Sequence, residues 1–177
     1  MTALVEQVTA SAGDPYAQML ALQNWFRAEF TYDDGVDYAS EPDALGAFLA
    51  DRRGFCQQFS STFALFARSL GVPSRVAVGF TQGDQVGTGA DGQLQFVVRG
   101  RHAHAWPEVY FEGVGWVPFE PTPQRGNPQA QSYTGVAPDQ APAPPEQEAT
   151  TTSTSAPSTT TLGSPTSTPS ELDATAT

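Results

Sequence analysis

Lysine is absent from this 177-residue chain, and two other residue types are scarce: there is one cysteine and there are two histidines. The basic residues are eight arginines against 19 acidic residues, so the formal net charge is -11. Binding to nucleic acid requires a basic surface for the phosphates, which this composition does not provide. We therefore expect no nucleic-acid partner.

A single cysteine, Cys56, excludes an intrachain disulfide and any metal or redox site of the CxxC type. The sequence has no apolar run of roughly 20 residues, the length that crosses a membrane as a helix. Met1 is not followed by the charged and apolar regions of a signal peptide. We expect the chain as written to be soluble, and to reach a membrane only through segments that this sequence does not contain.

Residues suited to a hydrophobic core are concentrated in the first two thirds of the chain. From residue 126 onward the only aromatic residue is Tyr133, and threonine, serine, proline and alanine dominate. Such a composition does not bury enough apolar surface to fold. The sequence therefore predicts one globular domain over residues 1–125 and a Ser/Thr/Pro-rich disordered linker or stalk over residues 126–177.

The spacing of apolar residues changes from helical to alternating within the predicted domain. Caps and periodicity predict helices at residues 15–30, 43–52 and 56–70, with Gly54 ending the second and Gly71 the third. Alternation predicts strands at 75–80, 94–98, 103–111 and 116–119. Helices followed by antiparallel strands indicate an α+β fold.

Cys56 begins the third predicted helix, where unpaired backbone N–H groups and the helix dipole favour a thiolate. Arg52, Arg53 or a histidine could add positive charge and lower the thiol pKa further. A thiolate there would be a nucleophile. The alternative is that Cys56 is a small core residue at the start of an apolar stripe.

The two histidines, His102 and His104, begin the strand predicted at 103–111. If a three-residue loop puts Phe111 opposite Gly115, His104 lies diagonal to Glu120 on one face of the hairpin. A two-residue loop would put the two side chains on opposite faces. The hairpin register therefore tests whether the carboxylate can orient the imidazole.

Three segments in this order resemble bacterial transglutaminase-like domains. They are RGFCQQF at 53–59 with LGVPSRVAVGF at 70–80, HAWPEVY at 104–110, and GWVPFEPTP at 115–123. The resemblance implies a papain-like catalytic domain in which Cys56 is the nucleophile, His104 is the base and Glu120 orients the histidine. It selects His104 over His102, which we expect to be a surface or supporting residue. The family more often has aspartate in place of Glu120.

The predicted activity is transfer of an acyl group from a protein or peptide amide through a thioester on Cys56. The Cys56 backbone N–H is a candidate oxyanion donor, and Tyr32, Gln57 and Gln58 are candidates for a second one. An amine acceptor would make the enzyme a transglutaminase, and water would make it a cysteine peptidase or amidase. Without lysine the chain has no ε-amine acceptor of its own.

Two other classes of function remain open at this stage. Cys56, His102, His104 and Glu120 could together form a zinc site, although the favoured interpretation requires no metal or cofactor. The domain could also be a non-catalytic binding module. The resemblance further implies an extracytoplasmic part of a bacterial membrane-anchored protein, for which residues 126–177 would serve as the stalk.

Overall fold

Helices come first and the main sheet second along the chain, as the sequence predicts for the α+β class. The structure is a computed structural model that describes residues 1–125, and the predicted linker at 126–177 lies outside the described residues. The helices are α1 (Thr2–Thr9), α2 (Pro15–Glu29), α3 (Ala44–Asp51) and α4 (Cys56–Ser69). The strands are β1 (Thr31–Tyr32), β2 (Arg53–Gly54), β3 (Ser74–Phe80), β4 (Asp84–Thr88), β5 (Leu94–Val97), β6 (Ala103–Phe111) and β7 (Gly115–Pro118).

The predicted helices α2, α3 and α4 are confirmed to within about two residues at each end. The Asp14 carboxylate accepts a hydrogen bond from the backbone N–H of Ala17 at 2.8 Å, and thereby caps α2. The predicted stop of α3 at Gly54 is wrong. Arg52 ends that helix in the left-handed conformation (φ 54°), and Gly54 instead forms β2.

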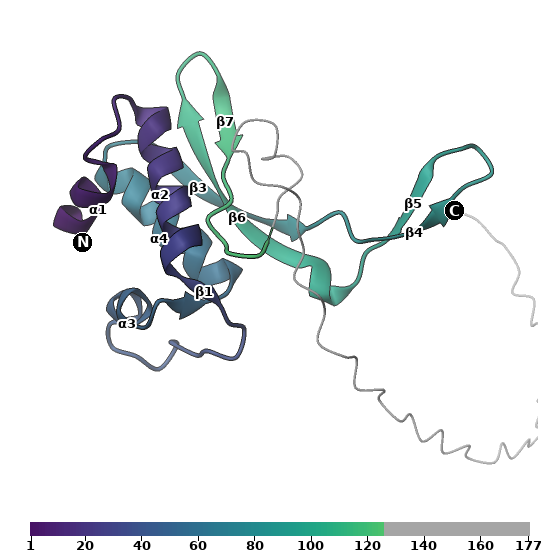
Figure 1. Cartoon of the computed structure of the whole chain (residues 1–177), viewed down its shortest axis with the longest axis horizontal. Helices are drawn as coiled ribbons and strands as arrows, with labels where there is room; N and C mark the ends of the chain where they lie inside the picture. Colours follow the sequence, from purple (N-terminus) through teal and green to yellow (C-terminus); the bar gives the residue numbers. More distant parts are fainter. Residues whose placement is uncertain (126–177) are drawn as a thin grey trace, which may run out of the picture. The chain divides into compact units, whose positions relative to one another are not determined.

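Helix α1 and the strands β1, β2 and β4 were not predicted. Helix α1 is short and has no side-chain cap, yet it buries Val5 completely. Strand β4 has a bulge between Gln85 and Gly87 and pairs only with β5. The two strands form a separate hairpin that projects away from the helices in Figure 1, whereas the sequence suggested no such separation.

The main sheet has three antiparallel strands in the order β3-β6-β7. Helix α4 lies against β6 and β3, and the Ser74 hydroxyl of β3 donates to the Ala64 carbonyl of α4 at 2.7 Å. A second, two-stranded parallel pair joins β1 to β2, with Tyr32 opposite Gly54. This pair connects the end of α2 to the residues immediately before Cys56.

The hydrophobic core lies between α2, α3 and α4 and is dominated by phenylalanine. Its fully buried aromatic members contact one another at centroid distances of 5.2 to 6.3 Å and include Phe26, Phe48, Phe59 and Phe66. These positions recur at helical spacing in the sequence, which is why the helices were predictable. Among residues 1–125, no helix is long and apolar enough to span a membrane.

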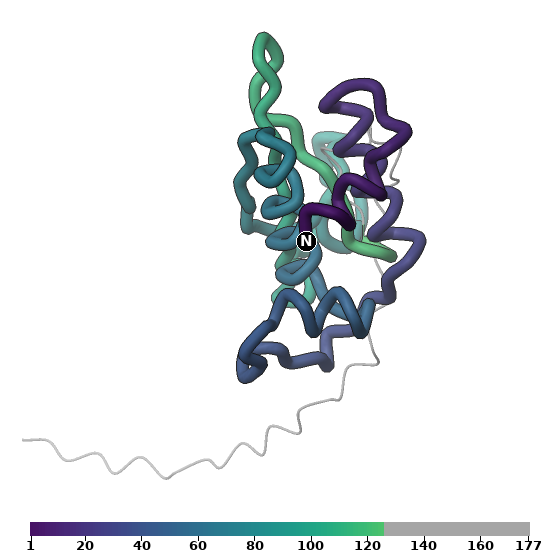
Figure 2. Tube along the Cα trace, turned by 90° about the vertical axis from the view of Figure 1, so that its left-hand side faces the viewer, coloured from purple at the N-terminus to yellow at the C-terminus, as the bar shows by residue number. Residues whose placement is uncertain are grey.

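The chain after β7 passes between α2 and α4 (Figure 2). Phe119 stacks on Phe63 of α4 with ring centroids 5.6 Å apart. On the other side, the backbone N–H of Glu120 donates to the side-chain oxygen of Gln23 of α2 at 2.9 Å. Glu120 is therefore fixed inside the domain by its backbone as well as by its side chain.

Candidate active site

Cys56 is the first residue of α4, as predicted, and its side chain is half-buried. The Phe55 backbone N–H before it donates to Gln58 Oε1 at 3.2 Å, which closes the first turn of the helix. The Cys56 N–H lies in that first turn, where backbone N–H groups have no acceptor within the helix. The thiol therefore lies at a helix end that favours negative charge.

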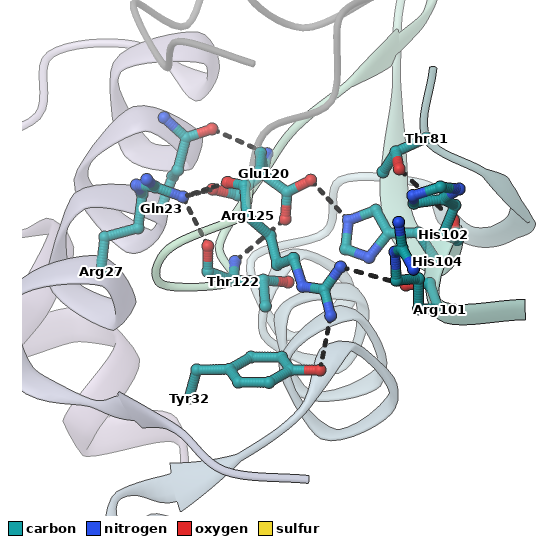
Figure 3. Close-up of polar contacts among 10 residues, drawn as sticks. All are labelled: Gln23, Arg27, Tyr32, Thr81, Arg101, His102, His104, Glu120, Thr122 and Arg125. Atoms are coloured by element: carbon teal, nitrogen blue, oxygen red, sulfur yellow. Dashed lines mark hydrogen bonds and ion pairs between the residues drawn. The ribbon is translucent and has the colours of Figure 1, made fainter. Parts of the chain in front are cut away.

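His104 and Glu120 meet as the hairpin register predicts. Phe111 pairs with Gly115, so the loop between them has three residues and the predicted register is confirmed. His104 Nε2 and Glu120 Oε2 are 2.7 Å apart, and the two residues are 3% and 0% exposed. The second carboxylate oxygen accepts from the backbone N–H of Thr122 at 3.1 Å. Both oxygens of the buried carboxylate thus have donors, and Figure 3 shows the group.

The other imidazole nitrogen of His104, Nδ1, is buried and has no hydrogen bond of ordinary geometry among residues 1–125. Because Glu120 occupies Nε2, Nδ1 is the nitrogen left to face the Cys56 thiol. The two side chains interact closely enough for each to change the pKa of the other.

Burial lowers the pKa of His104, but its interactions with Cys56 and then with Glu120 raise it more, to about 9. Burial also raises the pKa of the Cys56 thiol, but its interaction with His104 and the positive charge of the imidazole lower it. The backbone N–H of Ala105 and the charge of Arg125 lower it further, so the net pKa is below the usual thiol value. Both shifts favour a thiolate beside an imidazolium.

Of the charges that the sequence suggested near Cys56, a histidine does lower the pKa of the thiol, whereas the two neighbouring arginines are not among the main causes. Arg52 and Arg53 are exposed and form ion pairs with Glu29 and Asp33. The arginine that does contribute is Arg125, which was not among the predicted site residues. It lies 69 positions from Cys56 in the sequence, so no local pattern pointed to it.

Two side chains of α2 hold the segment that carries Glu120, and neither role was predicted from the sequence. Gln23 is completely buried and accepts the Glu120 backbone N–H. Arg27 Nη1 donates to the carbonyl oxygens of Glu120, Thr122 and Arg125 at 3.3, 2.5 and 3.0 Å. A signal for Gln23 was present, since it is the polar interruption in the apolar stripe of the helix.

Of the two expectations for His102, a surface residue or a supporting one, the first is wrong, because His102 is 1% exposed. Its Nδ1 accepts the backbone N–H of Arg99 at 2.8 Å, and its Nε2 lies 3.4 Å from Asp84 Oδ1. His102 thus fixes the base of the β4–β5 hairpin. Its two nitrogens face that hairpin base, so it does not join Cys56 in the suggested zinc site. Among residues 1–125, no three His, Cys, Asp or Glu side chains are arranged to hold a metal ion.

The candidates for a second oxyanion donor are placed as follows. Gln58 uses its side-chain oxygen to cap α4, and Gln57 is exposed. The Tyr32 hydroxyl accepts a hydrogen bond from Arg125 Nη2 at 3.0 Å. No one of the three is singled out as a donor to the reacting carbonyl.

Comparisons with known proteins agree with this architecture. The sequence profile of the family described as Transglutaminase-like superfamily matches residues 2–121. The chain is 38% identical over 129 residues to the uncharacterized protein YebA of Bacillus subtilis, covering 71% of this chain and 18% of that protein. It is 31% identical over 128 residues to a protein-glutamine gamma-glutamyltransferase of Pseudomonas aeruginosa, covering 69% of this chain and 18% of the relative.

A solved structure has the same fold. The periplasmic domain of TgpA from Pseudomonas aeruginosa superposes with a TM-score of 0.56 at 30% identity, covering 68% of this chain and 41% of that one. The chain thus spans less than half of the solved domain and about a fifth of the two curated relatives. The predicted papain-like, transglutaminase-like fold class is confirmed, and the chain belongs to the transglutaminase-like superfamily.

Proposed function

We propose that this domain is a cysteine-dependent acyltransferase that acts on carboxamides of proteins or peptides. The observation that carries the proposal is the buried 2.7 Å contact between His104 and Glu120, with the free imidazole nitrogen left for Cys56. The opposite pKa shifts of thiol and imidazole support it, because they favour the reactive ion pair. The Pseudomonas relative is named a protein-glutamine gamma-glutamyltransferase, which supports glutamine as the acyl donor.

In the proposed reaction the Cys56 thiolate attacks the carboxamide carbon and forms a tetrahedral intermediate. The Cys56 backbone N–H, at the start of α4, stabilises the oxyanion. The His104 imidazolium gives its proton to the departing amine, the C–N bond breaks, and a thioester remains on Cys56. The neutral imidazole then takes a proton from the acceptor, which attacks the thioester and releases the cysteine.

Glu120 positions the imidazole and does not touch the reacting atoms in this scheme. By accepting a hydrogen bond from Nε2–H at 2.7 Å, it directs Nδ1 toward Cys56 and stabilises the imidazolium. Its burial, at 0% exposure, removes competition from water for that hydrogen bond. The side chain is one methylene longer than the aspartate more common in the family, and still reaches the imidazole.

The identity of the acceptor is tested by supplying a glutaminyl peptide with and without a primary amine. We expect ammonia release together with amine incorporation, and neither with Cys56→Ser. Ammonia release without incorporation would identify water as the acceptor and hence a hydrolase. No release with a panel of glutaminyl peptides, from protein shown to be folded, would count against acyl transfer from glutamine.

We also propose that the domain works outside the cytoplasm. The support is its 30% identity to a solved periplasmic domain. The sequence prediction of a membrane-anchored protein agrees with this location. Fractionation of the native cells tests the proposal, and recovery of the native protein in the cytosol would refute it.

A further inference from the structure

Arg125 joins two segments of the chain that flank the site. Its Nη2 donates to the Tyr32 hydroxyl at 3.0 Å, and its Nη1 donates to the carbonyl oxygen of Arg101 at 3.4 Å. The guanidinium carbon lies 5.0 Å from the centroid of the Tyr32 ring. Figure 3 shows the side chain extended beside His104 toward both partners. Tyr32 belongs to β1, which pairs with the strand before Cys56, and Arg101 belongs to the turn before β6.

The charge of Arg125 has no carboxylate partner among the residues that the structure describes. Five other arginines form ion pairs with carboxylates: Arg52, Arg53, Arg75, Arg99 and Arg101. Arg125 Nε is buried and has no hydrogen-bond partner within residues 1–125. No carboxylate within the described residues therefore neutralises its positive charge. This charge lowers the pKa of the Cys56 thiol.

The site needs such a charge in its reactive form. With a thiolate on Cys56, an imidazolium on His104 and a carboxylate on Glu120, the three groups sum to one negative charge in a largely buried place. Burying a charge that no opposite charge balances costs free energy, and it shifts the pKa of the buried group so that its neutral form is favoured. The guanidinium of Arg125 brings the sum to zero.

The backbone of Arg125 is fixed independently of its side chain. Arg27 of α2 donates to the Arg125 carbonyl oxygen at 3.0 Å, from the same nitrogen that binds the carbonyl of Thr122. One arginine thus holds the main chain in place while the other reaches across to Tyr32. The position of the guanidinium is thus set by contacts of the Arg125 backbone and by contacts of the guanidinium itself.

We propose that Arg125 is a positioning residue of the site: bridged to Tyr32 and Arg101, it balances the charge of the Cys56, His104 and Glu120 group and holds the thiol in its ionised form. This inference rests on the proposed function, since it assigns a role to Arg125 in the same acyl-transfer site. Nothing in the reaction scheme above requires Arg125, so the two proposals fail separately.

The test uses two alkylating reagents on the single cysteine, neutral iodoacetamide and anionic iodoacetate, from pH 4 to 10. We expect Arg125→Gln to slow the reaction with iodoacetamide on the acidic side of the profile by roughly two- to fivefold, the usual range for one partly exposed charge. Arg125→Lys should recover part of this loss. The ratio of the iodoacetate rate to the iodoacetamide rate should also fall in Arg125→Gln, because both reagents attack the same thiolate but only one is anionic.

Arg53→Gln is the matched control, because it removes one positive charge three positions from Cys56 while its side chain is paired with Asp33. We expect it to leave both the profile and the reagent ratio unchanged. Equal effects of Arg53→Gln and Arg125→Gln would overturn the proposal, since they would reflect net charge alone. If Arg125→Gln does not fold, Tyr32→Phe replaces it and should lower the reagent ratio by releasing the guanidinium.

The outcomes separate the two proposals. A wild-type thiol that ionises like free cysteine would contradict the proposed function itself. A wild-type thiol of low pKa, with unchanged behaviour in Arg125→Gln, would overturn only the role of Arg125.

Discussion

Replacing Glu120 by glutamine should lower the pKa of His104 by about one unit. Glu120 accepts from His104 Nε2 at 2.7 Å and is 0% exposed, so the hydrogen bond is charge-assisted and shielded from water. A hydrogen bond to a charged group is stronger than a neutral one by roughly 1 to 1.5 kcal/mol. At 1.36 kcal/mol per unit, that difference corresponds to a fall in pKa from about 9 to about 8.

The amide of glutamine cannot serve both donors that the carboxylate serves. Thr122 N–H donates to one oxygen at 3.1 Å and His104 to the other, whereas an amide offers one oxygen. One donor is left facing an NH2 group, so we expect the variant to be less stable by about 1 to 3 kcal/mol as well. Activity that requires the imidazolium should then be lost at lower pH than in the wild type.

The assay is a pH titration by NMR of the imidazole carbon-bound protons. The chain has two histidines, so two pairs of signals are expected, Hδ2 and Hε1 of each ring, and His104→Gln assigns them. Glu108→Gln is the matched control, because Glu108 lies on the same strand as His104 but forms an ion pair with Arg75. A His104 pKa within about 0.3 units of the wild-type value in Glu120→Gln would refute the reasoning, given the one-unit change expected from the hydrogen bond.

Three further predictions concern how the site is held. Gln23→Leu should lower the free energy of unfolding by about 1 to 3 kcal/mol in urea denaturation, because the buried Glu120 N–H loses its acceptor; no change would show that water replaces it. Phe59→Ala should cost about 3 to 5 kcal/mol in the same assay, since the ring is 0% exposed, and a cost below about 1 kcal/mol would contradict the described core. Gly54→Ala should destabilise the domain by roughly 1 to 3 kcal/mol, because the added Cβ would lie 2.8 Å from the Phe48 ring. It should also slow alkylation of Cys56, which lies two residues further along the chain. Stability equal to that of the wild type would show that the ring can move.

Local patterns in the sequence predicted the elements that carry the proposed nucleophile and base. Helix α4 was identifiable because phenylalanines recur on one face and Gly71 follows as a stop signal. In the structure Gly71 adopts the left-handed conformation, with φ 78°. The contact between His104 and Glu120 followed from strand parity and one loop length, which are properties of a single hairpin. These features depend on residues close together in the chain.

The parts that were missed depend on contacts between distant residues or on local geometry that composition does not reveal. Gln23 meets Glu120 across 97 positions, and Arg125 meets Tyr32 across 93. Arg52 adopts a left-handed conformation that glycine more commonly fills, so the stop of α3 was assigned to Gly54. Arg52 and Arg53 were candidates for the charge near Cys56 because they precede it in the sequence, whereas Arg125 is distant in the chain.

The most direct test of the account is the rate of Cys56 alkylation by iodoacetamide as a function of pH, in the wild type and in His104→Ala. The lowered pKa of the thiol and the raised pKa of His104 predict rapid alkylation at neutral pH and below. In His104→Ala the reaction should rise at a higher pH, closer to the value near 8.5 of an ordinary thiol. Identical profiles for the two proteins, both rising only near that pH, would contradict the claim that His104 activates Cys56.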